Sequence, residues 1–340
     1  MNLIVKNVKD RLIKSLFLSM LIIVAACSPV TTPEVPVDVV PATNTSEPSE
    51  VVPIMTSIPT DEPTEVPTLA PTVPTEGELP QSLGAVKGII LFIGDGMGNA
   101  QRTAGRWVTV GQNGIMAMDR MQVSGWMSTA AYQNPVTDSA AAATAMATGY
   151  ITRNGRIGVD ADEVAVPTIL EQAKQRGWAT GLVTTTPISH ATPAGFAAHT
   201  TSRNNYELIA SQMLNLEVDV MLGGGEEIWL PSGTPGCNPG NGTRDDGRNL
   251  VEEAIGAGYT FVCSPAELAA VDTSNVSRLL GLFARDGLVR PHSPSLADMT
   301  RIAIEILSRD EDGFFLMVEG GQIDWAGHDN DPEDMLESVA

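Results

Sequence analysis

The chain contains 340 residues, of which 41 are Asp or Glu and only 20 are Lys or Arg, so its formal net charge is −21. This balance, without any basic stripe, argues against a nucleic-acid-binding protein, because such proteins neutralise phosphates with clustered Lys and Arg. A phosphate substrate is still allowed, since one arginine or bound metal ions can dominate the field of a local site. Residues 84–340 are numerous enough for one large α/β domain.

The N-terminal residues have the pattern of an export signal. Basic residues precede an apolar run over residues 16–26 that is too short to span a bilayer permanently. The basic residues are Lys6, Lys9, Arg11 and Lys14. The run ends in Val-Ala-Ala-Cys, which resembles a bacterial lipoprotein cleavage site, so we expect residues 1–27 to be a signal peptide with a lipidated Cys27. Lipidation would anchor the exported protein to a membrane of the cell envelope, with the folded domain outside the cytoplasm. A generic secretory cleavage near Ala26 is the alternative.

Residues 28–83 have the composition of a disordered linker. They contain twelve of the chain's 23 prolines and many Thr and Glu, with no Lys, Arg or aromatic residue. Such a segment cannot bury enough apolar surface to offset the entropy cost of ordering it. We therefore expect an extended acidic tether between the lipid anchor and a domain at residues 84–340.

The domain begins with a pattern typical of a buried parallel strand. Residues 86–93 form a short apolar run, and the glycine-rich turn Gly-Asp-Gly-Met-Gly follows at residues 94–98. Ligands of open α/β sheets bind at the carboxyl ends of strands, so Asp95 is a candidate site residue. A dinucleotide-binding loop is the competing interpretation. Its third glycine would be misplaced, and Asp95 would face a pyrophosphate unless a cation lay between them.

Residues 137–149 predict a buried helix with a candidate nucleophile at its start. Alanine and methionine favour a helix in this run, and Gly149 is a natural stop. Ser139 should therefore lie in or just before the first turn, where unpaired N–H groups and the helix dipole favour an anion. An N-cap serine on a core helix is the alternative interpretation.

The remaining elements alternate between helices and strands, which predicts an α/β fold with a mostly parallel central sheet flanked by helices. We expect a strand and turn within residues 118–131. Further strands are expected at residues 179–185, 218–225 and 314–318, and helices at residues 167–177, 298–308 and 332–340. Residues 188–195 follow the strand at 179–185, and the strand at 314–318 delivers Glu319 to the same edge.

Two pairs of residues leave alternatives open. Cys237 and Cys263 could form a disulfide in an exported protein, although the sequence does not show the pairing. Asp324 and His328 are four residues apart, so on a helix they share one face and could hold one metal ion. A surface hydrogen bond between them is the alternative, but the proximity of Glu319 favours a metal site.

Three motif blocks, in their order along the chain, resemble the alkaline phosphatase family. They are Ile-Gly-Asp-Gly-Met-Gly at residues 93–98, Thr-Asp-Ser-Ala and its helix at 137–149, and Glu-Gly-Gly-Gln-Ile-Asp-Trp-Ala-Gly-His at 319–328. Each block is weak alone, and the combination is specific. The resemblance covers most of residues 86–337 and implies an alkaline phosphatase-like fold. It also implies a metal-dependent phosphatase with two Zn²⁺ and one Mg²⁺, and a homodimer, since relatives are commonly dimers.

The resemblance also implies roles for individual residues. Ser139 matches the nucleophile, and Arg203 matches the arginine that clamps the phosphoryl oxygens. Asp95 matches the aspartate that bridges a zinc ion and the magnesium ion. Two further pairs match metal ligands: Thr192 and Glu319 for magnesium, and Asp324 and His328 for the other zinc.

The sequence departs from the best-known bacterial pattern of the family at two positions, and the family's last motifs are not among its 340 residues. His190 stands where an aspartate near the magnesium often lies, and Trp325 stands where a lysine near the phosphate often lies. The family's later Asp-His pair and its still later histidine would follow Ala340, so we expect a catalytic domain without its C-terminal part. A protein ending there would be inactive. His199 and His292 fall in no matching block and are interpreted as structural.

These observations predict hydrolysis of small phosphate monoesters through a phosphoserine at Ser139, with release of inorganic phosphate. A phosphodiesterase or sulfatase of the same superfamily is an alternative function. A surface lipoprotein that binds phosphate or metal through a degenerate site is another.

Overall fold

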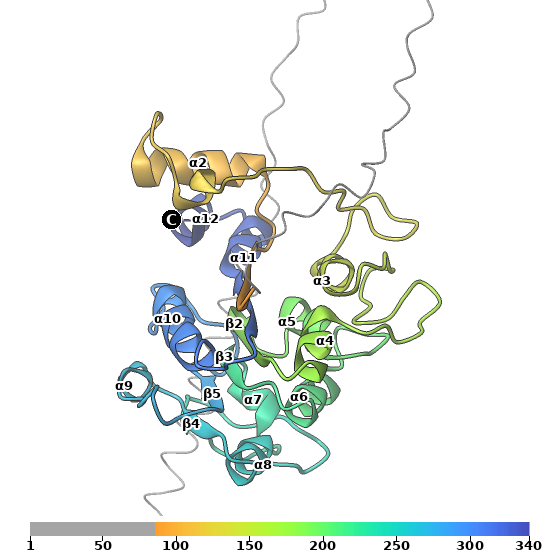
Figure 1. The fold of residues 1–340 in the computed structure, drawn as a ribbon, viewed down its shortest axis with the longest axis vertical. Helices are drawn as coiled ribbons and strands as arrows, with labels where there is room; N and C mark the ends of the chain where they lie inside the picture. The colour runs from red at the N-terminus through yellow and green to blue at the C-terminus, as the bar shows by residue number, and fades with distance from the viewer. Residues whose placement is uncertain (1–85, 340) are drawn as a thin grey trace, which may run out of the picture. The chain divides into compact units, whose positions relative to one another are not determined.

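The computed structural model describes residues 86–339, which fold around a six-stranded sheet (Figure 1). The strands are β1 (Gly88–Gly94), β2 (Ala179–Pro187), β3 (Val220–Gly224), β4 (Thr260–Val262), β5 (Leu279–Leu282) and β6 (Phe314–Gly320). The helices before β3 are α2 (Asn99–Val110), the 3₁₀ helix η1 (Ala117–Arg120), α3 (Ser139–Thr148), α4 (Ile169–Gln175), α5 (Ala191–Ala197) and α6 (Tyr206–Asn215). Those after β3 are α7 (Glu226–Trp229), α8 (Leu250–Gly256), α9 (Pro265–Ala269), α10 (Leu296–Leu307), α11 (Gln322–Asp329) and α12 (Pro332–Val339). The signal, lipid-anchor and linker predictions fall on residues 1–83 and lie outside the described residues.

All five strand pairings in the sheet are parallel, in the order β1-β6-β2-β3-β5-β4. The predicted mostly parallel α/β sheet is therefore confirmed. The strand expected to be buried at residues 86–93 is present as β1, but the burial was wrong, because β1 pairs on one side only within the described sheet and is largely exposed. The register aligns Ile93 of β1 with Glu319 of β6, and Glu319 with Thr184 of β2. Three strands that are far apart in the sequence thus deliver their carboxyl ends to one edge.

The core lies on both faces of the sheet, as the apolar composition of the strands requires. Along β6, Phe315 and Met317 point into one hydrophobic cluster, which includes buried residues of α3, α4, α5 and α6. The alternate residues Leu316 and Val318 point into a second cluster, which α10 covers. Figure 1 shows α10 on one side of the strands and α4, α5 and α6 on the other.

Local signals account for α3, the helix that carries the candidate nucleophile. The Asp138 side chain caps its start by accepting a hydrogen bond from the Ala141 N–H at 2.9 Å. Gly149 ends the helix in the left-handed conformation, with φ of 78°. A Cβ on Gly195 of α5 would lie 2.8 Å from the Ala143 Cβ, so α5 can approach α3 this closely only with glycine there.

The strand expected within residues 118–131 is wrong. The structure has η1 at its beginning, followed by irregular chain from Met121 to Ala130. Val123 and Trp126 are 85% and 92% exposed, and none of the described strands lies alongside to pair with this segment. Its β-forming side chains therefore have neither backbone partners nor a surface to bury against. The sequence interpretation also missed β4 and β5, which have only three and four residues.

Two further features concern the cysteines and the membrane. Cys237 and Cys263 form a disulfide with a Cα–Cα distance of 6.2 Å, so the open question of their pairing is answered by the structure. Within residues 86–339, no helix has the length and apolar character needed to cross a bilayer.

Candidate active site

A cavity of about 730 Å³ lies at the carboxyl edge of the sheet, where loops from β1 and β2 and the start of α3 meet α11. Seven of the residues predicted from the sequence line it: Asp95, Ser139, His190, Arg203, Asp324, Trp325 and His328. Glu319 and Thr192 are buried, with 0% and 1% exposure. The structure therefore gathers residues from five segments, separated by as many as 233 positions of sequence, around one cavity.

Ser139 is the first residue of α3, and its Oγ donates a hydrogen bond to Oδ2 of Asp95 at 2.9 Å. This contact joins the loop after β1 to a helix start 44 residues later. Burial raises the pKa of Asp95 most strongly, and the nearby Asp324 carboxylate raises it further. The serine hydroxyl thus lies against a carboxylate in a region of negative charge, at a helix end that favours anions.

Arg203 is held by two side chains that the fold places beside it. Its Nη1 donates to Oδ2 of Asp138 at 3.2 Å, and its Nη2 lies 3.0 Å from Nε2 of His190. Burial, followed by the positive charge of Arg203, lowers the pKa of His190 to about 4. The imidazole is therefore neutral near pH 7, so Nε2 accepts the arginine N–H. Asp138 was predicted only as part of a motif, and its role in orienting Arg203 was missed.

Glu319 is a carboxyl group enclosed by hydroxyls at the end of β6. Its Oε2 accepts hydrogen bonds from Thr184 and, at 3.3 Å, from Thr186, while Oε1 has no partner among the described residues. Burial and then the charge of Asp95 raise the pKa of Glu319 to about 7. The sequence signal for these hydroxyls was three consecutive threonines, residues 184–186, at the end of a buried strand.

Asp324 and His328 lie one turn apart on α11, as their spacing predicts, and His328 Nε2 is 3.5 Å from Asp324 Oδ2. The His328 side chain is 79% exposed. A Cβ on Gly96, which has φ of +64°, would lie 2.7 Å from Asp324 Oδ1, so glycine allows the close approach of α11 to the loop after β1. Trp325 packs edge-on against the His190 ring at 5.9 Å.

The donor set fits cations, although it does not form a finished metal cage. Carboxylates gather here with raised pKa values, and two buried atoms, Glu319 Oε1 and His190 Nδ1, lack partners among the described residues. Over the same residues, no group of three His, Cys, Asp or Glu side chains is placed to hold one metal ion. Bound cations would offset the repulsion between these carboxylates and supply a partner to the free oxygen of Glu319.

The other two histidines lie apart from these residues. His199 Nδ1 is 2.6 Å from the Gly158 carbonyl oxygen, and its Nε2 is 2.9 Å from Glu171 Oε1. Hydrogen bonding to Glu171 raises the pKa of His199 above its usual value. His292 lines a second cavity, beside α10. Neither contributes to the cavity at Ser139.

Comparisons with known proteins agree with this geometry. A model of the alkaline phosphatase family matches residues 86–340. Alkaline phosphatase 3 of Bacillus subtilis is 43% identical over 264 residues, covering 72% of this chain and 53% of the relative. The crystal structure of Thermus thermophilus alkaline phosphatase superposes with a TM-score of 0.66 at 34% identity, over 76% of this chain and 55% of that one.

A third similar protein is a histidine-to-aspartate mutant of alkaline phosphatase from the Antarctic bacterium TAB5, solved with Mg bound in its M3 site. It is 30% identical with a TM-score of 0.64, over 75% of this chain and 70% of that one. The chain spans about half the length of the curated relatives it matches. A family match over residues 86–340, together with a shared fold, shows that the chain belongs to the alkaline phosphatase family.

Proposed function

We propose that this protein hydrolyses phosphate monoesters through a phosphoserine at Ser139 and releases inorganic phosphate. The observation that carries the proposal is the 2.9 Å contact between Ser139 Oγ and Asp95 Oδ2, at a helix start that faces a cavity lined by Arg203. Membership of the alkaline phosphatase family supports monoesters as the substrate class. No feature of the described site favours the phosphodiester, sulfate ester or binding-only alternatives.

The residues around the cavity have distinct parts in this reaction. Asp95 accepts the Ser139 hydroxyl hydrogen bond and so orients Oγ for attack on phosphorus. Asp138 and His190 hold the guanidinium of Arg203, whose planar fork can bind two phosphoryl oxygens. The N–H groups at the start of α3 favour the negative charge of the substrate. Positioning and charge stabilisation are the contributions that phosphoryl transfer requires of a protein.

The proposal includes two Zn²⁺ ions and one Mg²⁺ ion. Thr192, Glu319 and Asp95 offer oxygen ligands of the kind that Mg²⁺ prefers. Asp324 and His328 offer a mixed oxygen and nitrogen pair for one Zn²⁺, and Asp95 offers an oxygen to the other. Such ions would lower the pKa of an attacking hydroxyl and stabilise the charge on the attacking and leaving oxygens. The Mg bound to the TAB5 alkaline phosphatase mutant supports metal binding by this family.

The test uses the complete protein rather than residues 1–340 alone, purified and supplied with Zn²⁺ and Mg²⁺. We expect release of 4-nitrophenol from 4-nitrophenyl phosphate, with much slower release from the corresponding diester and sulfate ester. Mass spectrometry should find phosphate on Ser139 after an acid quench. Ser139→Ala should reduce the rate by about 1,000-fold or more, because it removes the nucleophile. The matched control is Ser128→Ala, an exposed serine that does not line this cavity. Equal rates for Ser139→Ala and the control would refute the assignment.

We also propose that the protein is exported and lipid-anchored through Cys27, and that it forms a homodimer. Export and the anchor are supported by the signal-like pattern of residues 1–27 and the resemblance of Val-Ala-Ala-Cys to a lipoprotein cleavage site. The homodimer is supported by membership of the alkaline phosphatase family. Labelling cells with a radioactive fatty acid should mark the wild-type protein and leave Cys27→Ser unlabelled. Light scattering of the purified protein should give twice the mass of one chain.

A further inference from the structure

A tight turn at residues 153–156 lies between the chain segments that carry Ser139 and Arg203. A 3.2 Å hydrogen bond from the N–H of its last residue to the carbonyl oxygen of its first closes the turn. Of the two central residues, Asn154 and Gly155, only the glycine has a positive φ, of 79°, which is typical of a type II turn. The reaction proposed above uses neither residue, although both bond to groups next to the nucleophile and the arginine.

Asn154 holds the chain immediately before the nucleophile. Its Oδ1 accepts a hydrogen bond from the Asp138 N–H at 3.2 Å, and its Nδ2 donates one to the Val136 carbonyl oxygen at 3.0 Å. One side-chain amide thus bridges residues 136–138 with an acceptor and a donor, a combination that alanine lacks. Ser139 is the next residue, so its Oγ takes its position partly from Asn154.

Gly155 joins the cap of α3 to the arginine. Its N–H donates to Asp138 Oδ2 at 2.9 Å, and its carbonyl oxygen accepts a hydrogen bond from the Arg203 backbone N–H at 2.8 Å. The same Oδ2 accepts a hydrogen bond from Arg203 Nη1 at 3.2 Å. Asp138, Gly155 and Arg203 therefore form a closed ring of three hydrogen bonds, which holds both the backbone and the guanidinium of the arginine. A shift of the turn would move the guanidinium relative to the start of α3.

The chain after the turn is fixed on both sides. Gly158 N–H donates to Oγ1 of Thr144, in the middle of α3, at 3.0 Å. Ile157 and Thr200 exchange two backbone hydrogen bonds of 3.0 and 2.9 Å. Thr144 and Ile157 are 0% exposed, so water cannot readily replace these contacts if they break. The Asn-Gly turn is thus a fixed link between α3 and the segment that carries Arg203.

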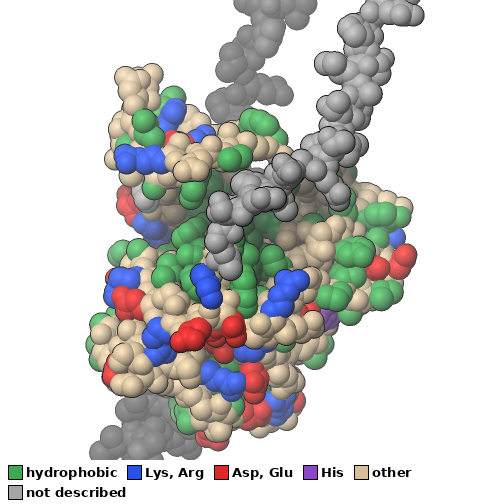
Figure 2. All heavy atoms as spheres, viewed as in Figure 1, with side chains coloured by type: hydrophobic (Ala, Val, Ile, Leu, Met, Phe, Trp, Pro, Cys, Tyr) green, Lys and Arg blue, Asp and Glu red, His purple; other side chains and the backbone are tan. Residues whose placement is uncertain are grey.

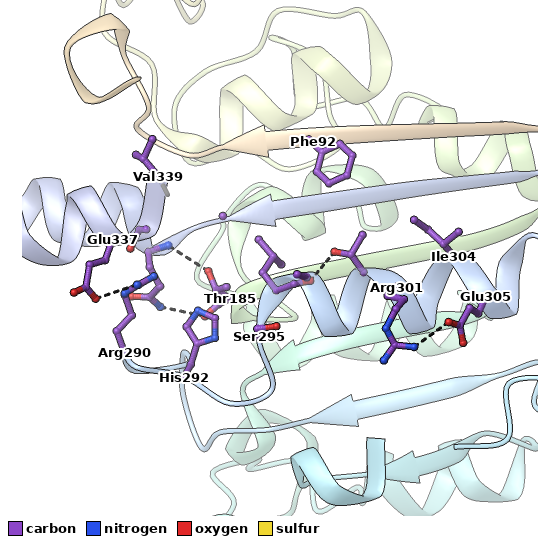
Figure 3. A pocket seen from close by; sticks show the side chains of 16 residues that line it. Phe92, Thr185, Arg290, His292, Ser295, Arg301, Ile304, Glu305, Glu337 and Val339 are labelled. Atoms are coloured by element: carbon purple, nitrogen blue, oxygen red, sulfur yellow. Dashed lines mark hydrogen bonds and ion pairs between the residues drawn. The ribbon is translucent and has the colours of Figure 1, made fainter. Parts of the chain in front are cut away.

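Arg203 differs in this respect from arginines on the surface. Figure 2 shows Lys and Arg side chains lying among Asp and Glu side chains on one face of the molecule. Figure 3 shows one such pair in the second cavity, beside α10, where Arg301 lies 2.9 Å from a Glu305 carboxylate that is itself 41% exposed. An exposed partner of this kind adds little order to an arginine. Asp138, the partner of Arg203, is 24% exposed and is held in place by the Asn-Gly turn.

We propose that Asn154 is a positioning residue, and that its turn sets the geometry in which Ser139 and Arg203 meet a phosphoryl group. This inference rests on the proposed function, since it assigns Arg203 to the phosphoryl oxygens. The described residues that line the cavity at Ser139 include neither Asn154 nor Gly155, so the turn acts only through the groups that it holds. Small displacements of binding and reacting groups are costly, so loss of this preorganisation weakens phosphate binding while the fold persists.

The test uses the complete protein, purified and supplied with Zn²⁺ and Mg²⁺, and measures binding of inorganic phosphate by isothermal titration calorimetry. Asn154→Ala should weaken phosphate binding by about tenfold, because a misplaced guanidinium loses about one charge-assisted hydrogen bond to the anion. The KM for 4-nitrophenyl phosphate should rise by a similar factor with a smaller change in kcat, since the arginine binds substrate and transition state alike. The control Asn204→Ala removes an exposed amide next to Arg203 that does not line the cavity, and it should leave phosphate binding unchanged.

A pair of glycines separates positioning from stability. Gly155 and Gly149, which ends α3, have φ of 79° and 78°, and a Cβ at either would meet no atom of the described residues within 4 Å beyond its chain neighbours. Gly155→Ala and Gly149→Ala should therefore bear similar backbone strain and lower the unfolding midpoint by similar amounts. Only Gly155→Ala should weaken phosphate binding, by about threefold or more. Equal weakening by both would mean that lost stability is responsible and would overturn the proposal.

A double-mutant cycle shows whether Asn154 acts through Arg203. In an Arg203→Ala background, Asn154→Ala should change phosphate affinity by less than about twofold, because the group that it positions is absent. Independent, additive losses would overturn the proposal, as would full phosphate affinity in Asn154→Ala or a wild type that binds no phosphate. Phosphate binding that follows these predictions without hydrolysis of 4-nitrophenyl phosphate would support the positioning role and refute the proposed function, so the two failures are distinguishable.

Discussion

Replacing Glu319 with Gln should stabilise the metal-free protein at alkaline pH. The folded structure raises the pKa of this carboxyl group from 4.5 to about 7, because it is fully buried and lies near Asp95. At 1.36 kcal/mol per pKa unit, ionising Glu319 in the folded state costs about 3 kcal/mol more than in the unfolded chain. Gln has the same shape and no charge, so it avoids this cost.

The sign of the pH dependence follows from the raised pKa. Well below pH 4.5 the carboxyl group is protonated in both states, and the wild type bears no penalty. Between pH 4.5 and about 7 the unfolded chain loses its proton first, so the wild type loses stability as the pH rises. The free-energy difference between Glu319→Gln and the wild type should therefore grow by about 3 kcal/mol from pH 4.5 to about pH 8.

The difference in unfolding free energy between the two proteins is measured by urea unfolding in the presence of a chelator, with circular dichroism as the signal. All other titrating groups are common to the two proteins, so their contributions cancel. Adding Mg²⁺ at alkaline pH should stabilise the wild type more than Glu319→Gln, because an ion bound near the carboxylate gives Oε1 the partner that it lacks among the described residues. Parallel stability curves for the two proteins over the whole pH range would refute the reasoning, since the buried carboxyl group would then carry no charge penalty.

Two further predictions concern stability away from the cavity at Ser139. Hydrogen bonding to Glu171 raises the pKa of His199, so its stabilising contribution should be complete below the unfolded pKa of about 6.5 and lost as the pH rises through the folded pKa. His199→Gln should therefore lower the thermal unfolding midpoint more at acidic than at alkaline pH; a loss independent of pH would contradict this. The Cys237–Cys263 disulfide closes a loop with a sequence separation of 26, so the Cys237→Ala/Cys263→Ala double variant should be less stable by about 3.5 kcal/mol in urea unfolding. An unchanged unfolding midpoint would show that the disulfide does not restrain the unfolded chain.

The sequence by itself determined the local elements and the chemical nature of the site. The run at residues 137–149 contains its own start and stop signals, and the structure has α3 between Asp138 as cap and Gly149 in the left-handed conformation. The apolar runs before Asp95 and Glu319 became the parallel strands β1 and β6. Of these, β6 is buried as a continuous apolar run predicts, whereas β1 lies at the edge of the described sheet and is largely exposed. These signals are local, so they can be read without knowing the fold.

Only the tertiary structure decided which of these elements meet. The hydrogen bond from Ser139 to Asp95 and the hydrogen bond from Thr184 to Glu319 join residues 44 and 135 positions apart. The first depends on where α3 lies relative to the loop after β1, and the second depends on the pairing of β2 with β6. The same limit explains the strand wrongly expected around Val123, whose β propensity was overruled because no neighbouring strand supplies hydrogen-bond partners or a surface. Strand pairing and burial are properties of the assembled sheet, and a single segment of sequence does not contain them.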